Sequence, residues 1–257
     1  MLDGVLDVLF PRRCVGCGAR PWPFCTDCVP RVALLSPPGC RRCGRPLEDW
    51  VAVCGDCPPP VIDWSRSAFL YEGPIRRGLM RLKFSGLSQV ARALAPAMME
   101  ALARAPPAKG PMDEDEPFVM TWVPLAGRRR RERGYDQAEM LARAIRSLTG
   151  WPLRPTLRRE VETAPQARRA GPERRRALRG AFAAVSDVAS ARIVLIDDVL
   201  TSGATAAECA TVLRKGGARE VGVLTAARSL GGGIPARCYN PARFPPGSVV
   251  ARGRSSR

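Results

Sequence analysis

Eight cysteines between residues 14 and 57 are spaced as metal ligands. They form four Cys-x-x-Cys pairs, namely Cys14/Cys17, Cys25/Cys28, Cys40/Cys43 and Cys54/Cys57. One such turn places two thiolates on one ion, and two turns complete a tetrahedral site of four sulfurs with no open position. The spacing predicts two structural Zn²⁺ sites, with the first four cysteines in one and the last four in the other.

The same thiols permit other chemistry. Iron–sulfur clusters use the same ligand set, disulfides form in oxidising compartments, and interleaved pairing of the turns would also give two metal sites. Asp3 and Asp7 interrupt the apolar residues at the start of the chain, so we expect no secretory signal and a cytoplasmic protein, which favours zinc. A segment this short depends on its metal to fold.

A second group of reactive side chains follows an apolar run at residues 193–196. Asp197 and Asp198 come next, and the hydroxyl-rich stretch after them consists of Thr201, Ser202, Gly203, Ala204 and Thr205. Two carboxylates at the carboxyl end of a buried strand lie where α/β folds bind ligands. Hydroxyls and backbone N–H groups at a helix N-terminus suit a phosphate. Together they predict a site for a ribose 5-phosphate, and an Asx-turn with a helix cap is the purely structural alternative.

Several classes of site are excluded. The chain has no histidine, which rules out Ser-His-Asp and Cys-His nucleophile systems and histidine-ligated metals. The loop after Asp198 lacks the glycine and lysine patterns of P-loop nucleotidases and of dinucleotide-binding folds. No stretch approaches the roughly 18 uninterrupted apolar residues of a membrane helix, so no membrane span is expected.

The elements around the acidic pair predict a parallel sheet. The strand at 193–196, a helix over 205–215 and a returning strand at 221–226 form a βαβ unit. Earlier in the chain, the pattern predicts a helix around Ile75, Leu79 and Leu82, a helix over 88–104 that Pro96 kinks, and a strand over 118–123. Asp136 and Glu139 fit a capping box for a helix that stops at Gly150.

Composition divides the chain into three parts. Residues 1–60 hold the cysteine pairs, 61–230 hold the sheet and helices, and 231–257 contain five arginines and no acid, which predicts a disordered basic tail. Within the middle part, 106–117 is a linker or surface loop, and the arginine-dense stretch 163–179 is a mobile loop or an exposed helix.

The net charge of +17 indicates an anionic partner, although the excess of arginine over lysine also fits a compositional bias. Bias does not explain where the charge lies. Residues 118–180 hold 16 arginines and 6 acids, whereas residues 1–60 hold 7 arginines and 6 acids. The positive field therefore belongs to the middle of the chain.

The stretch 194–205, VLIDDVLTSGAT, resembles the phosphoribosyl pyrophosphate (PRPP) signature of type I phosphoribosyltransferases. The cysteine pairs and further motifs resemble the ComF competence family over roughly residues 1–230. These motifs are YEG at 71–73, LKF at 82–84, PL at 124–125, RERGYDQ at 131–137, TAPQ at 163–166, and Arg175 through GAF at 180–182.

The resemblance implies a double zinc ribbon ahead of a type I phosphoribosyltransferase-like parallel sheet flanked by helices. Asp197 and Asp198 would be catalytic and bind the ribose hydroxyls, while 201–205 would wrap the 5-phosphate of PRPP, which binds with Mg²⁺. The pyrophosphate loop would comprise Leu125, Ala126, Gly127, Arg128 and Arg129, and 163–176 would form a flexible lid. Ala126 and Ala177 depart from the family pattern, where histidine and asparagine are common.

Three functions follow from these observations. The first is pentosyl transfer from PRPP to an unknown acceptor in a protein that acts in DNA uptake. The second is a non-catalytic protein that uses the same fold to bind single-stranded DNA beside DNA-uptake proteins, although aromatic side chains for base stacking make up only 6% of the chain. The third is a nucleotide-salvage transferase, for which no base-specificity segment is recognisable.

Overall fold

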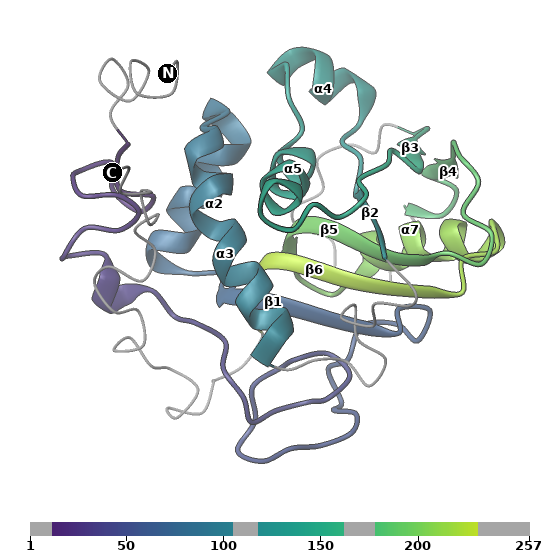
Figure 1. The fold of residues 1–257 in the computed structure, drawn as a ribbon, viewed down its shortest axis with the longest axis horizontal. Coiled ribbons are helices and arrows are strands. Elements are labelled where there is room, and N and C mark those ends of the chain that lie inside the picture. Colours follow the sequence, from purple (N-terminus) through teal and green to yellow (C-terminus); the bar gives the residue numbers. More distant parts are fainter. Residues whose placement is uncertain (1–11, 105–117, 162–177, 231–257) are drawn as a thin grey trace, which may run out of the picture.

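Four parallel strands form the central sheet of the computed structural model, which describes residues 12–104, 118–161 and 178–230 (Figure 1). In sheet order the strands are β1 (Trp64–Leu70), β6 (Glu220–Arg228), β5 (Arg192–Leu200) and β2 (Val119–Trp122). All three strand pairs are parallel. The predicted α/β class, a parallel sheet flanked by helices behind a cysteine-rich ribbon, is confirmed.

Helices cover both faces of the sheet. Helices α2 (Gly73–Ser85), α3 (Ser88–Arg104) and α5 (Gln137–Thr149) pack on one face, and α7 (Ala204–Lys215) packs on the other (Figure 1). Along β5, Val194 and Ile196 join the first of these cores, whereas Ile193 and Leu195 join the second. Burial on both faces explains the unbroken apolar run that the sequence shows there.

The predicted helices are confirmed, with small changes at their ends. Helix α3 has the expected bounds and contains Pro96, and α7 begins one residue early. Asp136 caps α5 by accepting from the N–H groups of Ala138 and Glu139, and Gly150 ends it in the left-handed conformation. The reciprocal half of the capping box is absent from the hydrogen bonds of the described residues, because the Glu139 carboxylate pairs with arginines instead.

Strand β5 is longer than the apolar run predicts. It continues through the acidic pair to Leu200, and Asp197 lies opposite Thr225 of β6. Main-chain pairing with β6 extends beyond the point where the side chains become polar. The two aspartates therefore lie within the strand itself and not in a loop after it.

A two-stranded antiparallel sheet, β3 (Leu157–Arg159) and β4 (Phe182–Ala184), lies beside the central sheet. Most of the connection between its strands, including the predicted lid at 163–176, lies outside the described residues, as do the predicted linker at 106–117 and the tail at 231–257. No helix in the described ranges is both long and apolar enough to cross a bilayer.

The cysteine-rich segment is almost free of regular structure. Its described part contains one short 3₁₀ helix, η1 (Val29–Arg31), and isolated bridges. Apolar side chains of this segment, among them Val15, Phe24 and Val32, belong to the same core cluster as α2 and α3. The cysteine-rich segment therefore shares a hydrophobic core with these helices.

Candidate metal centres and candidate phosphate site

The eight predicted cysteine ligands gather into two groups. The sulfur atoms of Cys14, Cys17, Cys25 and Cys28 lie within 4.8 Å of one another, and so do those of Cys40, Cys43, Cys54 and Cys57. Sγ–Sγ distances such as 3.5 Å for Cys17–Cys25 and 3.5 Å for Cys43–Cys54 are close to the roughly 3.8 Å edge of a tetrahedral Zn–sulfur site. The sequential pairing is confirmed, and the geometry fits two structural zinc ions.

Backbone amides favour the thiolate form in each group. Burial raises the pKa of Cys14, but hydrogen bonds from backbone N–H groups outweigh it and lower the pKa to about 6. The same balance lowers the pKa of Cys40 to about 7. One thiol in each group is thus prepared to ligate a cation, since the thiolate is the form that binds metal.

The predicted acidic pair lies half-buried near the end of β5. The Asp197 carboxylate accepts from the N–H of Asp198 at 2.8 Å, and the Asp198 carboxylate accepts from the N–H of Val199 at 2.9 Å. Burial and the neighbouring charge of Asp198 raise the pKa of Asp197 well above its usual value. Hydroxyl donors from a ligand would relieve this repulsion by hydrogen bonding to the ionised carboxylates.

The hydroxyl-rich stretch makes a tight turn from β5 into α7. Gly203 precedes the helix with φ +74°, a left-handed conformation that favours glycine, and Ala204 begins the first helical turn. Thr201 and Ser202 are exposed. The N-terminus of α7 thus opens beside the acidic pair, which is the arrangement the sequence predicts for an anionic group.

The predicted pyrophosphate loop differs from its expected form. Gly127, Arg128 and Arg129 begin a short helix, α4 (Gly127–Arg133), instead of an open loop. An ion pair from Arg128 to Glu132 at 2.7 Å supports that helix. Of the five residues of the predicted loop, Leu125 and Ala126 precede the helix. Arg128 and Arg129 therefore project from its first turn.

A buried carboxylate, that of Asp136, joins the start of the predicted pyrophosphate segment to helix α5. The Leu125 N–H donates to Asp136 at 2.7 Å, and Asp136 is 2% exposed. Burial raises the pKa of Asp136, and its charge also acts on Asp197. Asp136 therefore fixes the start of the predicted pyrophosphate segment, and it lies near enough to Asp197 for charge interaction.

Arg159 on β3 lies near the acidic pair, although no sequence pattern predicts it there. Its guanidinium lies 5.3 Å from the Phe182 ring and is near enough to Asp197 and Arg129 for charge interaction. Burial and the positive charge of Arg129 lower the pKa of Arg159. Nothing in the sequence marks this arginine, because its neighbours in space come from other strands and helices.

The motifs LKF at 82–84 and RERGYDQ at 131–137 meet at the C-terminal end of α2. The guanidinium of Arg133 lies 5.0 Å from the Phe84 ring, and the ammonium of Lys83 lies 5.7 Å from it. The Tyr135 hydroxyl donates to the Lys83 carbonyl at 3.2 Å. Since Phe84 is 59% exposed, this cluster presents an aromatic side chain with two cations close to its ring.

A basic cavity of about 340 Å³ opens at the β2 edge of the sheet. Its lining residues are Trp122, Arg130, Glu139, Arg143, Arg146, Leu153 and Pro155. Glu139 accepts from Arg130 at 3.2 Å and from Arg143 at 2.7 Å, which leaves the lining with excess positive charge. Its size and charge suit a phosphate-bearing ligand.

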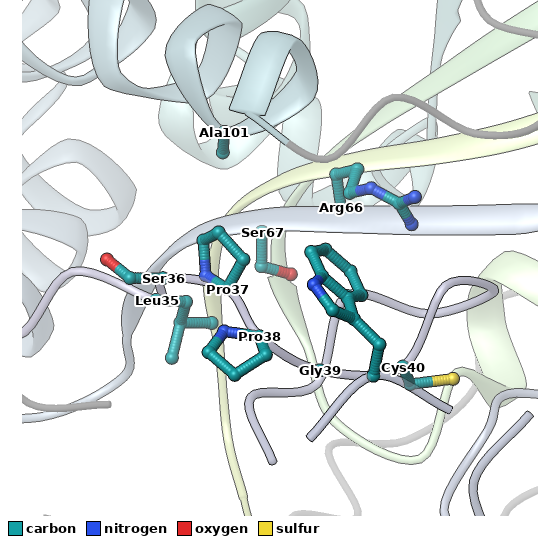
Figure 2. A pocket seen from close by; sticks show the side chains of 11 residues that line it. Leu35, Ser36, Pro37, Pro38, Gly39, Cys40, Arg66, Ser67 and Ala101 are labelled. Carbon is teal, nitrogen blue, oxygen red and sulfur yellow. The ribbon is translucent and has the colours of Figure 1, made fainter. Parts of the chain in front are cut away.

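Figure 2 shows a much smaller cavity between the cysteine-rich segment and β1. Its volume is about 20 Å³, and Ser36, Pro37, Pro38 and Ser67 are among its lining residues. Such a space holds about one water molecule, so it is not a ligand site.

Comparisons with known proteins agree with the cysteine groups. Residues 5–58 match the model of the double zinc ribbon domain family. The DNA utilization protein YhgH of Salmonella typhimurium is 32% identical over 81% of this chain and 92% of its own. Competence protein F of Haemophilus influenzae is 30% identical over 80% of this chain and 90% of its own. A phosphoribosylpyrophosphate synthetase structure from Mycobacterium smegmatis is 20% identical, with a TM-score of 0.31 over 57% of this chain and 36% of that one.

Proposed function

The chain belongs to the ComF competence family, and on that premise we propose that it binds PRPP with Mg²⁺ at the carboxyl end of the sheet and acts in DNA uptake. One observation carries the proposal. Asp197 and Asp198 lie half-buried at the end of β5, directly before a helix N-terminus that Gly203 opens. Carboxylates beside a phosphate-binding turn match the two ends of a ribose 5-phosphate.

In the proposed complex, each part of the site has one task. Asp197 and Asp198 accept hydrogen bonds from the ribose hydroxyls, and residues 201–205 donate N–H groups and hydroxyls to the 5-phosphate. Arg128 and Arg129 offset the charge of the pyrophosphate. Asp136 holds the segment before them in place.

The proposed reaction is displacement at C1 of the ribose. The bond from C1 to the pyrophosphate oxygen breaks, its electron pair leaves with pyrophosphate, and an acceptor nucleophile forms the new bond to C1. Positive charge develops on the sugar ring, and the nearby carboxylates stabilise it. Mg²⁺ bound to the substrate would neutralise part of the leaving group's charge.

Calorimetric titration of PRPP with Mg²⁺ tests the proposal. The wild-type chain should bind, and the double variant Asp197→Ala/Asp198→Ala should lose binding. The matched control is Glu48→Ala/Asp49→Ala, which removes an exposed adjacent acidic pair elsewhere in the molecule. If the wild type does not bind, or if both double variants bind equally well, the PRPP site is not where we place it.

The basic cavity at the β2 edge favours a second candidate function, the binding of single-stranded DNA. Arg130, Arg143 and Arg146 converge there from α4 and α5. Titrations of a labelled oligonucleotide at several salt concentrations test it. Arg143→Ala/Arg146→Ala should weaken binding and reduce the salt slope by about 1.4, because each lost contact with a single strand removes about 0.7. Arg76→Ala/Arg92→Ala, an exposed pair on α2 and α3, is the control.

A further inference from the structure

The second cysteine group lies against the turn that we assign to phosphate binding. A Cβ added at Gly203 would lie 2.8 Å from Cβ of Pro58 and 3.5 Å from Cδ of Pro59. Pro58 follows the ligand Cys57 directly. The chain that leaves the second metal group therefore forms the outer wall of the turn at Gly203.

Two buried arginines fasten this metal group to the sheet. Arg228, at the end of β6, is 3% exposed and donates to the carbonyls of Cys43 at 2.9 Å and Asp56 at 3.0 Å. Arg66, on β1, is 2% exposed and donates to the carbonyls of Arg41 at 2.8 Å and Arg42 at 3.1 Å. A zinc ion with four thiolates is doubly negative, and two buried guanidiniums balance that charge.

Further hydrogen bonds connect the second metal group to the turn from two sides. Arg42 donates to the carbonyls of Pro59 at 3.0 Å and Ile62 at 2.8 Å, which fixes the segment after Pro58. Ser229, the residue after Arg228, donates its N–H to the carbonyl of Leu200 at 2.9 Å, just before the turn begins. The metal group and the turn thus share one hydrogen-bonded framework.

The first metal group has different surroundings. Arg77 donates to the carbonyl of Gly16 at 2.9 Å, and Arg81 donates to the carbonyl of Cys14 at 3.2 Å. Both arginines belong to α2. A Cβ at Gly16 would lie 2.6 Å from Cβ of Pro74, at the start of the same helix. The first group is therefore a natural control for the second.

We propose that the metal in the second group positions the phosphate turn, so that the sugar-phosphate affinity depends on zinc at Cys40, Cys43, Cys54 and Cys57 and not on zinc in the first group. With the metal bound, Cys57 holds Pro58 against Gly203. When the metal is absent, Cys57 is no longer held, and the turn loses its contact with Pro58. This inference rests on the PRPP proposal for the ligand, and Arg228 acts in it as a positioning residue.

Paired ligand variants of the full chain test the inference. Cys54→Ser and Cys17→Ser should each reduce zinc from two ions per chain to one, measured by mass spectrometry of the metal. Cys54→Ser should weaken PRPP–Mg²⁺ binding by about 10-fold or more, the size of effect typical when the support of a site is lost. Cys17→Ser should change binding by less than about twofold. Equal effects of the two variants, or no effect of Cys54→Ser, would overturn the inference.

Two further measurements keep the test decisive. Amide hydrogen exchange at residues 200–205 should be faster in Cys54→Ser than in Cys17→Ser without any ligand, so this arm stands even if the wild type fails to bind PRPP. If Cys54→Ser does not fold, Pro58→Gly, which removes the Cβ that faces Gly203, and Arg228→Gln replace it, because they keep all eight thiols. Both should retain two zinc ions and show faster exchange at 200–205, and unchanged exchange in both contradicts the inference.

Discussion

The carboxylate of Asp136 accepts the backbone N–H of Leu125 at 2.7 Å while it caps helix α5 through Ala138 at 3.0 Å. One buried side chain thereby joins the end of β2 to the start of α5. Residues 125–136, which include α4 and its arginines, therefore form a loop whose two ends meet at the Asp136 carboxylate.

Replacing Asp136 should therefore destabilise the protein more than an exposed acid does. We expect Asp136→Ala to lower the free energy of unfolding by about 2 kcal/mol, because it removes a helix cap and leaves buried N–H groups without an acceptor. Urea denaturation followed by circular dichroism measures this. Glu132→Ala on exposed α4 is the control, and an equal loss in both variants would refute the role of Asp136.

The pH dependence of stability should change when Asp197 is neutralised. Burial and the charge of Asp198 raise the pKa of Asp197 in the folded state. Since the folded state then keeps the proton to higher pH than the unfolded chain, stability falls as pH rises through the raised pKa. At about pH 8, Asp197→Asn should raise Tm by about 2–4 °C, the shift that about 1 kcal/mol gives in a chain of this size. The gain should shrink toward about pH 4, and a constant difference across this range would contradict the raised pKa.

Gly203→Ala should be more damaging than Gly150→Ala. Both glycines have positive φ, at 74° and 72°, so an alanine is strained at either position. A Cβ meets nothing within 4 Å at Gly150, whereas it meets Pro58 at 2.8 Å at Gly203. Thermal melts should show a loss of about 1 kcal/mol for Gly150→Ala and a clearly larger loss for Gly203→Ala. Equal losses would mean that the contact with Pro58 is unimportant.

Acid should release the metal from both cysteine groups. Without a metal, backbone hydrogen bonds lower the pKa of Cys14, whereas burial raises the pKa of Cys28 to about 12, and a bound cation lowers the pKa of every ligand thiol. Zinc should thus stay bound at neutral pH and dissociate in acid, as protons compete for the thiolates. A colorimetric chelator measures the release. Purified protein with visible absorption and iron instead of zinc would contradict the assignment.

Patterns among neighbouring residues were enough to predict most helices and strands and both metal groups. The Cys-x-x-Cys turns, the cap at Asp136 and the unbroken apolar run in β5 depend on neighbouring residues, which the sequence displays directly. The packing of Pro58 on Gly203 and the approach of Arg159 to Asp197 depend on how distant segments meet in space. Helix α4 was missed because Gly127 and the arginines after it resemble a loop, and its support comes from the pairing of Arg128 with Glu132.

The bond from Arg228 to the carbonyl of Cys43 spans 185 residues, and this separation orders events during synthesis. The second cysteine group leaves the ribosome early, whereas β6 is made after every other strand of the central sheet. The ribbon can bond to Arg66 once β1 has emerged, but its bonds from Arg228 wait until β6 is made. A nascent chain that stalls before β6 would therefore lack the bonds from Arg228 to its second cysteine group.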